Sequence, residues 1–139
     1  DVNLILPIDV LCSNSINSRP IKGNFPIEDI PKDAIGLDIG TDTISLFKSI
    51  LSTSKTILWN GPMGVFEKKY FSKGTEELGK ILSKKVLEDA KVIVGGGDTA
   101  AALELFGLHK NMTHVSTGGG ASLELLSGNT LPAIKSLEK

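Results

Sequence analysis

The stretch Val92-Ile93-Val94-Gly95-Gly96-Gly97-Asp98-Thr99 indicates the fold class of this chain. Three apolar, β-branched residues lead directly into three glycines, and Ala100-Ala101-Ala102-Leu103 continues with residues that favour a helix. A strand that is apolar on both faces is typical of a buried parallel sheet, in which a helix follows each strand and crosses back over the sheet. We therefore predict a strand–turn–helix unit here, within an α/β fold built on a parallel sheet.

A second stretch of the same kind follows it. In His114-Val115-Ser116-Thr117-Gly118-Gly119-Gly120-Ala121-Ser122-Leu123, a short strand again runs through three glycines into a predicted helix. Glycine has no Cβ, so a ligand can approach its backbone closely, and a helix that begins there adds unpaired N–H groups and the positive end of its dipole. Such turns bind anions, most often phosphate. Two of them in one sheet predict a site for a nucleotide or for a phosphoryl group in transit.

The whole chain after residue 31 alternates strand and helix. Before it, we predict a strand at residues 2–6, stopped by Pro7, and a polar loop at 13–31 with room for a short strand near residues 21–22. Because ligands bind beyond the carboxyl ends of parallel strands, the glycines that end the later strands are expected at one edge of one sheet. The predicted strands are 35–40, 55–60, 91–94 and 114–115, followed respectively by helices at 41–51, 71–87, 98–106 and 119–126.

Composition excludes several classes of function. The 139 residues carry a formal net charge of −1, which gives no electrostatic basis for binding nucleic acid or an anionic membrane. The single cysteine, Cys12, excludes an internal disulfide and a cysteine-rich metal site. No apolar run approaches the roughly 18 residues that span a bilayer. The chain opens almost at once on a predicted strand, without an initiator methionine, so we expect it to be a piece of a longer protein.

The first glycine turn does not match the usual phosphate-binding motifs. No Gly-Lys-Ser/Thr follows Gly95-Gly96-Gly97, as a P-loop requires, and Ala100 stands where a dinucleotide fingerprint has its last glycine. Asp98 can serve as the N-cap of the next helix, and its carboxylate would repel a phosphate unless Mg²⁺ lay between them. The residues alone leave two roles of Asp98 open, a cap only or a cap that also binds magnesium.

A third motif, Trp59-Asn60-Gly61-Pro62-Met63-Gly64-Val65-Phe66-Glu67, follows a predicted strand. Asn60 can donate a hydrogen bond to a phosphate oxygen, Gly64-Val65 can offer a flat apolar surface to a base, and Glu67 can accept both hydroxyls of a ribose. Taken without context, residues such as Asn60 and Glu67 are more often turn or surface residues. The aromatic residues Trp59 and Phe66 are expected in the core.

The three motifs, in this order and at these separations, resemble those of the phosphoglycerate kinase family. The resemblance extends over essentially the whole chain and corresponds to the C-terminal third of such an enzyme. It implies two Rossmann-like lobes, with this chain as the incomplete C-terminal lobe, an α/β three-layer sandwich around a parallel sheet. It also implies a cytoplasmic, monomeric kinase that transfers the acyl phosphate of 1,3-bisphosphoglycerate to Mg-ADP, giving 3-phosphoglycerate and ATP.

The resemblance assigns roles to individual residues. Four are expected to border the adenine base: Gly36, Leu37, Gly64 and Val65. Glu67 is expected to bind the ribose hydroxyls and Asn60 a nucleotide phosphate. The first glycine turn is expected to hold the phosphates, with Asp98 acting through Mg²⁺, by means of Gly96, Gly97, Asp98 and Thr99. The second turn is expected to take the catalytic role of holding the phosphoryl group during transfer, by means of Gly118, Gly119 and Gly120.

The chain departs from the family pattern at two positions. Met63 stands where valine is common, and Thr41 replaces a frequent proline, where it can cap the following helix. The N-terminal lobe, with its phosphoglycerate pocket and catalytic arginine, and the first strands of the nucleotide lobe are missing from the sequence. We therefore divide the chain into a partial nucleotide-binding domain at residues 1–130 and a tail at 131–139 that is expected to return to the other lobe. The isolated chain is expected to be inactive.

Two other functions are compatible with the residues. A stand-alone nucleotide-binding module would carry the same glycine turns without catalysis, and titration with Mg-ADP separates a preformed site from a fragment that does not bind. An NAD-binding Rossmann domain would fit the predicted sheet, although the chain lacks the glycine fingerprint and the acidic residue that binds the ribose.

Overall fold

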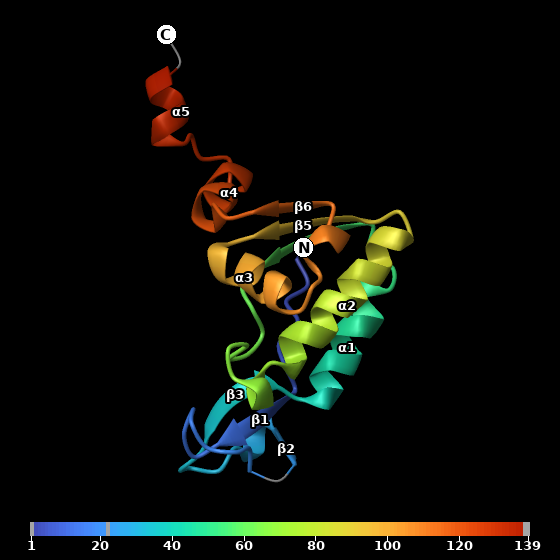
Figure 1. The fold of residues 1–139 in the computed structure, drawn as a ribbon, viewed down its shortest axis with the longest axis vertical. Coiled ribbons are helices and arrows are strands. Elements are labelled where there is room, and N and C mark those ends of the chain that lie inside the picture. The colour runs from blue at the N-terminus through green and yellow to red at the C-terminus, as the bar shows by residue number, and fades with distance from the viewer. Residues whose placement is uncertain (1, 22, 138–139) are drawn as a thin grey trace.

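The computed structural model describes residues 2–21 and 23–137, in which two three-stranded sheets are connected by helices (Figure 1). The strands are β1 (Asp9–Ser13), β2 (Asn24–Pro26), β3 (Ile35–Ile39), β4 (Thr56–Asn60), β5 (Lys91–Gly95) and β6 (His114–Ser116). The α-helices are α1 (Thr41–Leu51), α2 (Lys73–Leu87), α3 (Gly97–Leu105), α4 (Gly119–Leu126) and α5 (Pro132–Leu137). Short 3-10 turns occupy η1 (Ile27–Asp29), η2 (Lys69–Phe71) and η3 (His109–Asn111).

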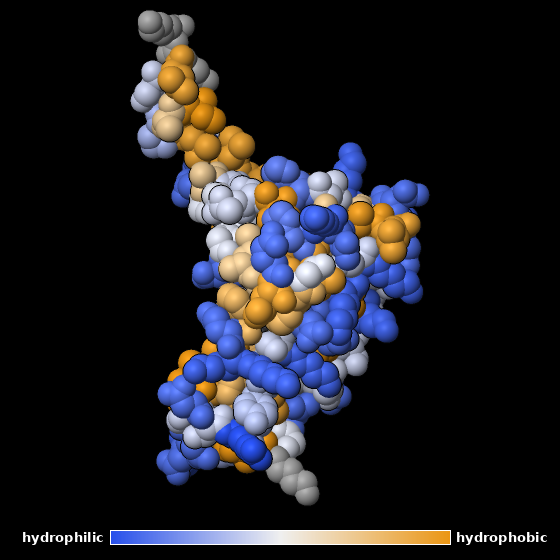
Figure 2. Space-filling view, in the orientation of Figure 1, coloured by the Kyte–Doolittle hydropathy of each residue, from blue (hydrophilic) through white to orange (hydrophobic). Residues whose placement is uncertain are grey.

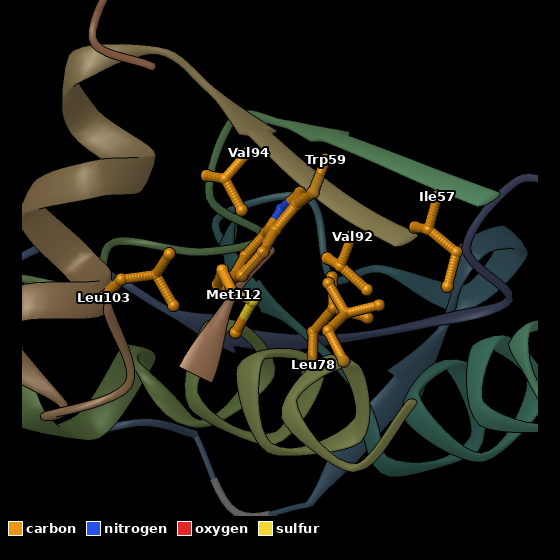
Figure 3. Close-up of a cluster of buried hydrophobic side chains, with 8 residues drawn as sticks. Ile57, Trp59, Leu78, Val92, Val94, Leu103 and Met112 are labelled. Carbon is orange, nitrogen blue, oxygen red and sulfur yellow. The ribbon is translucent and has the colours of Figure 1, made fainter. Parts of the chain in front are cut away.

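Strands β4, β5 and β6 form the parallel sheet that the sequence predicts. Asn60, Gly95 and Ser116 stand side by side at the carboxyl ends of the three strands. Helices α2 and α3 pack on this sheet, and Figure 3 shows side chains from the strands and from both helices pointing toward one another. Removal of these side chains from water is the main favourable contribution to folding in this half. The core cluster consists of Ile57, Trp59, Leu78, Leu82, Val92, Val94, Leu103 and Met112.

The first of the four predicted strand–helix units lies in a different sheet. β3 pairs antiparallel with β1, with Leu11 opposite Asp38, and β1 pairs with β2 on its other side. The prediction that all four glycine-ended strands share one edge of one sheet is therefore wrong for β3. The alternation of strand and helix does not reveal this, because the partner of β3 is β1, which follows Pro7 and is not predicted as a strand.

The strand predicted at residues 2–6 is also wrong. These residues have no regular structure, and Val2 and Leu4 are 97% and 79% exposed. An apolar run becomes a strand when a neighbouring strand takes up its backbone hydrogen bonds, and within the described chain none pairs with residues 2–6. The short strand predicted near residues 21–22 is displaced as well. Lys22 lies outside the described residues, and β2 begins at Asn24.

One face of the parallel sheet is open to solvent. Leu58 on β4 and Ile93 on β5 are 41% and 37% exposed, whereas Ile57 and Val92, which point to the other face, are buried. The strands thus alternate in burial, although their uniformly apolar composition predicts two buried faces. Apolar composition alone does not tell whether a face is covered by the chain itself.

Helices α1 and α2 connect the two sheets. α1 packs on β1 and on α2, while α2 contacts both β3 and β5 (Figure 1). At the start of α1, the carboxylate of Asp9 accepts hydrogen bonds from the N–H groups of Asp42 (3.2 Å) and Thr43 (2.7 Å). The helix is therefore capped by Asp9 from a neighbouring strand and not by Thr41, which makes no capping bond.

The last two helices extend away from the body of the molecule (Figure 1). α5 has no buried residue, and Leu125, Leu126 and Leu137 are all more than half exposed. Figure 2 shows apolar surface over this part of the chain. None of the described helices is both long and apolar enough to cross a membrane.

Candidate functional site

The two glycine turns meet at the carboxyl edge of the parallel sheet. The N–H of Gly96 donates to the carbonyl of Ser116 (2.9 Å), and a Cβ on Gly119 would lie 2.7 Å from the Cα of Gly96. Gly96 has φ +99°, a backbone conformation that side-chain-bearing residues rarely adopt. The close approach of the two backbones requires glycine at position 119, and the positive φ favours glycine at position 96. The prediction that the two turns lie at the same edge is confirmed.

Each turn opens a helix and leaves backbone donors without a partner in that helix. In α3 the first helical hydrogen bond is donated by Ala100 to the carbonyl of Gly96 (3.0 Å), so the N–H groups of residues 97–99 precede it. In α4 the first such bond runs from Ser122 to Gly118 (2.9 Å), which leaves those of residues 119–121. Two sets of helix-terminal donors, with their dipoles, therefore lie next to each other at one sheet edge. The N–H of Gly118 itself donates to Oγ of Ser116 (3.2 Å).

Asn60 lies between the two turns. Its Oδ1 would be 2.9 Å from a Cβ on Gly96 and 3.1 Å from a Cβ on Gly119, and the residue is exposed. The side chain of Asn60, at the end of β4, thus lies beside the glycine turns that follow β5 and β6. An exposed amide among backbone donors adds a further hydrogen-bonding group for an anion.

Asp98 occupies the second position of α3, and its carboxylate is exposed. The N-cap of this helix is Gly96, and no side-chain capping bond is present, so the prediction that Asp98 caps the helix is wrong. Among residues 2–21 and 23–137, no group of three or more histidine, cysteine and acidic residues could hold a metal on protein ligands alone. One carboxylate beside a phosphate-sized anion site does fit Mg²⁺, which binds to one or two carboxylates together with phosphate oxygens and water.

Thr99 is fully buried, in contrast to Asp98. Its Oγ1 accepts a hydrogen bond from the N–H of Gly61 (2.8 Å), and the indole N–H of Trp59 donates to the carbonyl of the same Gly61 (2.7 Å). The side chain of Thr99 therefore ties the start of α3 to the loop that follows β4. Trp59 and Phe66 are buried, as the sequence predicts.

A hollow of about 320 Å³ lies where that loop meets the antiparallel sheet of β1, β2 and β3. The four residues predicted to border a base all line it, and the N–H of Val65 donates to the carbonyl of Leu37 (3.0 Å). Glu67 lies two residues beyond Val65 and is exposed, but it does not line the hollow. The complete lining is Val10, Gly36, Leu37, Asp38, Ile39, Met63, Gly64 and Val65.

Other hollows lack the features of this edge. One of about 180 Å³ between α1, α2 and β4 is almost wholly apolar and offers no polar group to orient a ligand. A larger one of about 490 Å³, lined by Lys80, Lys84 and Lys110 among others, lies beside the second half of α2 and η3, near the amino ends of the strands. The glycine turns stand at the opposite ends of the same strands.

Sequence reasoning missed Asp38 in the floor of the 320 Å³ hollow. Asp38 is only 4% exposed, and burial raises the pKa of its carboxyl group from 3.8 to about 6, against the lowering effects of the Gly74 and Ile39 N–H groups and of the charge of Lys73. An acidic residue inside the otherwise apolar strand Ile35-Gly36-Leu37-Asp38-Ile39 was the signal that could have found it.

The profile of the phosphoglycerate kinase family matches residues 1–129 of this chain. The chain belongs to the phosphoglycerate kinase family. Curated relatives include the phosphoglycerate kinase of Thermosipho africanus, 47% identical over 96% of this chain and 34% of that protein. The cytosolic phosphoglycerate kinase of Nicotiana tabacum is 47% identical over 99% of this chain and 34% of that protein. The chain spans about a third of the length of these relatives.

Solved structures of the family have the same fold over this part. Phosphoglycerate kinase from Coxiella burnetii superposes with a TM-score of 0.86 at 41% identity, covering 96% of this chain and 34% of that structure. The enzyme from Pyrococcus horikoshii superposes with a TM-score of 0.78 at 30% identity, covering 95% of this chain and 32% of that structure. The predicted α/β fold class with a parallel, Rossmann-like sheet is confirmed.

Proposed function

We propose that this chain provides a large part of the nucleotide site of a phosphoglycerate kinase. The reaction is the reversible transfer of the acyl phosphate of 1,3-bisphosphoglycerate to Mg-ADP, which yields 3-phosphoglycerate and ATP. The contact of the two glycine turns beside Asn60 is the observation that supports this proposal most strongly, because it gathers backbone donors from two helices at one point.

In this proposal the two halves of the site bind different parts of the nucleotide. The hollow between Gly36-Leu37 and Gly64-Val65 takes the adenine base, and Glu67, which is exposed two residues after Val65, binds the ribose hydroxyls. The N–H groups at the start of α3 and the amide of Asn60 take the phosphates. Thr99 contributes its backbone N–H, while its buried hydroxyl holds the loop after β4 through Gly61.

Phosphoryl transfer depends on positioning and on neutralising charge more than on covalent chemistry by the protein. The turn Gly118-Gly119-Gly120 would hold the phosphoryl group during transfer, with the N–H groups of Gly119 and Gly120 as donors fixed before the reaction begins. The N–H of Gly118 already donates to Ser116, so Gly118 contributes space. Asp98 is the residue of this chain that would hold Mg²⁺, which neutralises phosphate charge when it is bound. Gly96 acts differently, because its N–H already donates to Ser116, so it contributes space for the approach of a phosphate.

The rest of the reaction requires parts of a phosphoglycerate kinase that this chain does not contain. We propose that the phosphoglycerate substrate binds to the other lobe, that the complete enzyme is a cytoplasmic monomer, and that residues 131–139 return to that lobe. Among the described residues of this tail, the exposed apolar side chains of Ile134 and Leu137 are compatible with such packing. The 139-residue chain alone is expected to have no transferase activity.

Calorimetric titration of the 139-residue chain with Mg-ADP tests the proposal. We expect saturable binding of Mg-ADP, weaker binding of adenosine, and no turnover of ATP with 3-phosphoglycerate. Binding without turnover in a longer chain that also contains the remaining lobe would favour the alternative of a nucleotide-binding module. If Mg-ADP does not bind to the folded chain, the chain alone does not form the proposed nucleotide site.

A further inference from the structure

Asp38 is enclosed between the loop that carries Gly64 and the first turn of α2. Its Oδ2 accepts a hydrogen bond from the N–H of Gly74 (2.8 Å), and its Oδ1 accepts one from the N–H of Ile39 (2.9 Å). A Cβ on either Gly64 or Gly74 would overlap Oδ1 of Asp38. The carboxylate thus fills the space between two glycines that are ten positions apart in the chain.

The residue after Gly74 holds the same loop by a second route. Thr75 is 1% exposed, and its Oγ1 accepts hydrogen bonds from the N–H groups of Met63 (3.0 Å) and Gly64 (3.4 Å). The first turn of α2 therefore has two links to the hollow, with Asp38 holding Gly74 and Thr75 holding Met63-Gly64. Buried polar groups connected in this way are costly to leave half satisfied, so the arrangement is rigid.

We propose that Asp38, acting through the Gly74-Thr75 turn and by direct contact with Gly64, is a positioning residue that sets the distance between the two walls of the nucleotide-base hollow. The expected effect of Asp38 on nucleotide affinity rests on the proposed function, whereas its effect on the loop does not. Asp38 touches the wall and not the reacting atoms, so it affects the affinity for the base and leaves the phosphate site unchanged.

The structure provides a matched control for a purely structural role. Asp9 on β1 is also a buried carboxylate, 5% exposed, and accepts from N–H groups in the first turn of α1. A Cβ on Gly40 would overlap the Asp9 carboxylate, just as a Cβ on Gly64 or Gly74 would overlap that of Asp38. Asp9 thus does for α1 what Asp38 does for α2, but it has no hydrogen bond to residues 61–66.

The experiment compares Asp38→Asn with Asp9→Asn in the 139-residue chain. Asp38 and Asp9 each accept backbone N–H groups on both carboxylate oxygens, and asparagine has only one acceptor oxygen. We therefore expect both variants to lose stability. Only Asp38→Asn is expected to speed amide hydrogen exchange at Met63, Gly64 and Val65, by about tenfold relative to Asp9→Asn. It should also weaken Mg-ADP binding by about tenfold, while affinity for Mg-pyrophosphate stays within about twofold.

The Thr75→Val and Thr75→Ser variants provide a second test with a smaller perturbation. Valine removes the hydroxyl at nearly constant volume, and serine restores it. We expect faster exchange of the Met63 and Gly64 amides in Thr75→Val and a return to the wild-type rate in Thr75→Ser. If Asp38→Asn does not fold, this pair decides the question, and equal exchange in both variants overturns the inference.

The outcomes separate the inference from the proposed function. If the wild-type chain binds Mg-ADP and Asp38→Asn changes neither the exchange rates at residues 63–65 nor the affinity, the inference is overturned and the proposed function stands. If the wild-type chain binds no nucleotide, the exchange rates alone still decide whether Asp38 positions the wall, and the proposed function fails for the chain on its own.

Discussion

One half of the proposed site is formed by backbone atoms and the other by side chains. At the edge of the parallel sheet, backbone lies against backbone: Gly119 is in contact with Gly96, and the N–H of Gly96 donates a hydrogen bond to the carbonyl of Ser116. At the antiparallel sheet, the hollow depends on side chains: Asp38 accepts from Gly74 and lies against Gly64, and Thr75 accepts from Gly64. The first half is therefore sensitive to an atom added where the two turns touch, and the second to the loss of a hydrogen-bonding group.

The same contrast extends to distance along the chain. The glycine turns lie within residues 95–120 and are consecutive strand–helix units of one sheet. The hollow gathers Val10, residues 36–39 and residues 63–65, which come from two strands and a loop. Local sequence thus specifies most of the phosphate side, whereas the base side forms only when distant segments fold together.

The largest effect is expected from a side chain at the point where the two turns touch. Gly119→Val would place its Cβ 2.7 Å from the Cα of Gly96, so the turns must separate. We expect Mg-ADP affinity to fall by about a hundredfold or more and the free energy of unfolding to fall by about 1–3 kcal/mol, measured by calorimetry and urea denaturation. In the control variant Gly120→Ala the new Cβ meets nothing within 4 Å, and stability should be close to wild type. Equal behaviour of the two variants would contradict the backbone contact.

On the half formed by side chains, the expected effect is a pH dependence of stability. The pKa of Asp38 is about 6 in the folded chain, above its ordinary value of 3.8, so between these values the folded state binds more protons than the unfolded state. The free energy of unfolding should therefore fall as pH rises from 4 to 6, by about 2 kcal/mol from this group. Urea denaturation of wild type and Asp38→Asn across this range measures the difference. A wild-type curve parallel to that of the variant would show that Asp38 does not titrate there.

A smaller effect is expected at Asp98, the single carboxylate on the half formed by backbone. Asp98→Asn should weaken ADP binding by about tenfold in the presence of Mg²⁺ and cause no loss of binding in EDTA, because without the metal the carboxylate only repels the phosphates. Calorimetry with and without the metal provides both values. Equal losses under the two conditions would mean that Asp98 acts on the phosphates or the fold without magnesium.

The smallest effect is expected at Glu67, which is exposed two residues beyond the hollow. Glu67→Gln should weaken ADP binding by about threefold to tenfold, in keeping with one exposed, solvent-accessible pair of hydrogen bonds. 2′-Deoxy-ADP is the matched ligand, since it lacks one of the two hydroxyls, and the variant should discriminate less between the two nucleotides than wild type does. Unchanged discrimination would remove Glu67 from the ribose site.

How much can be predicted from the sequence follows the same division. The glycine turns, the helices α1 to α4 and the parallel pairing of β4, β5 and β6 are predictable, because apolar strands and glycine blocks are local signals. The membership of β3 in the antiparallel sheet is not predictable, since its partner β1 follows a proline and is identified only by its long-range pairing.

The errors in residue roles have a common cause. Position in the sequence indicates Asp98 and Thr41 as helix caps, whereas Gly96 is the N-cap residue of α3 and Asp9 caps α1 from a neighbouring strand. Asp38 escapes sequence reasoning for the same reason, because its partners Gly64 and Gly74 lie far along the chain. Caps and buried carboxylates depend on contacts between segments, which residue spacing does not encode.

The central claim is that the turns at Gly96–Thr99 and Gly118–Gly120 face one nucleotide site. Amide chemical shifts recorded during a titration of the 139-residue chain with Mg-ADP test it most directly. The account predicts that the amides of Gly97 and Gly120 shift together with that of Gly64, with one shared dissociation constant. Shifts confined to one turn, or gathered instead around Lys80, Lys84 and Lys110 at the other end of the sheet, would contradict it.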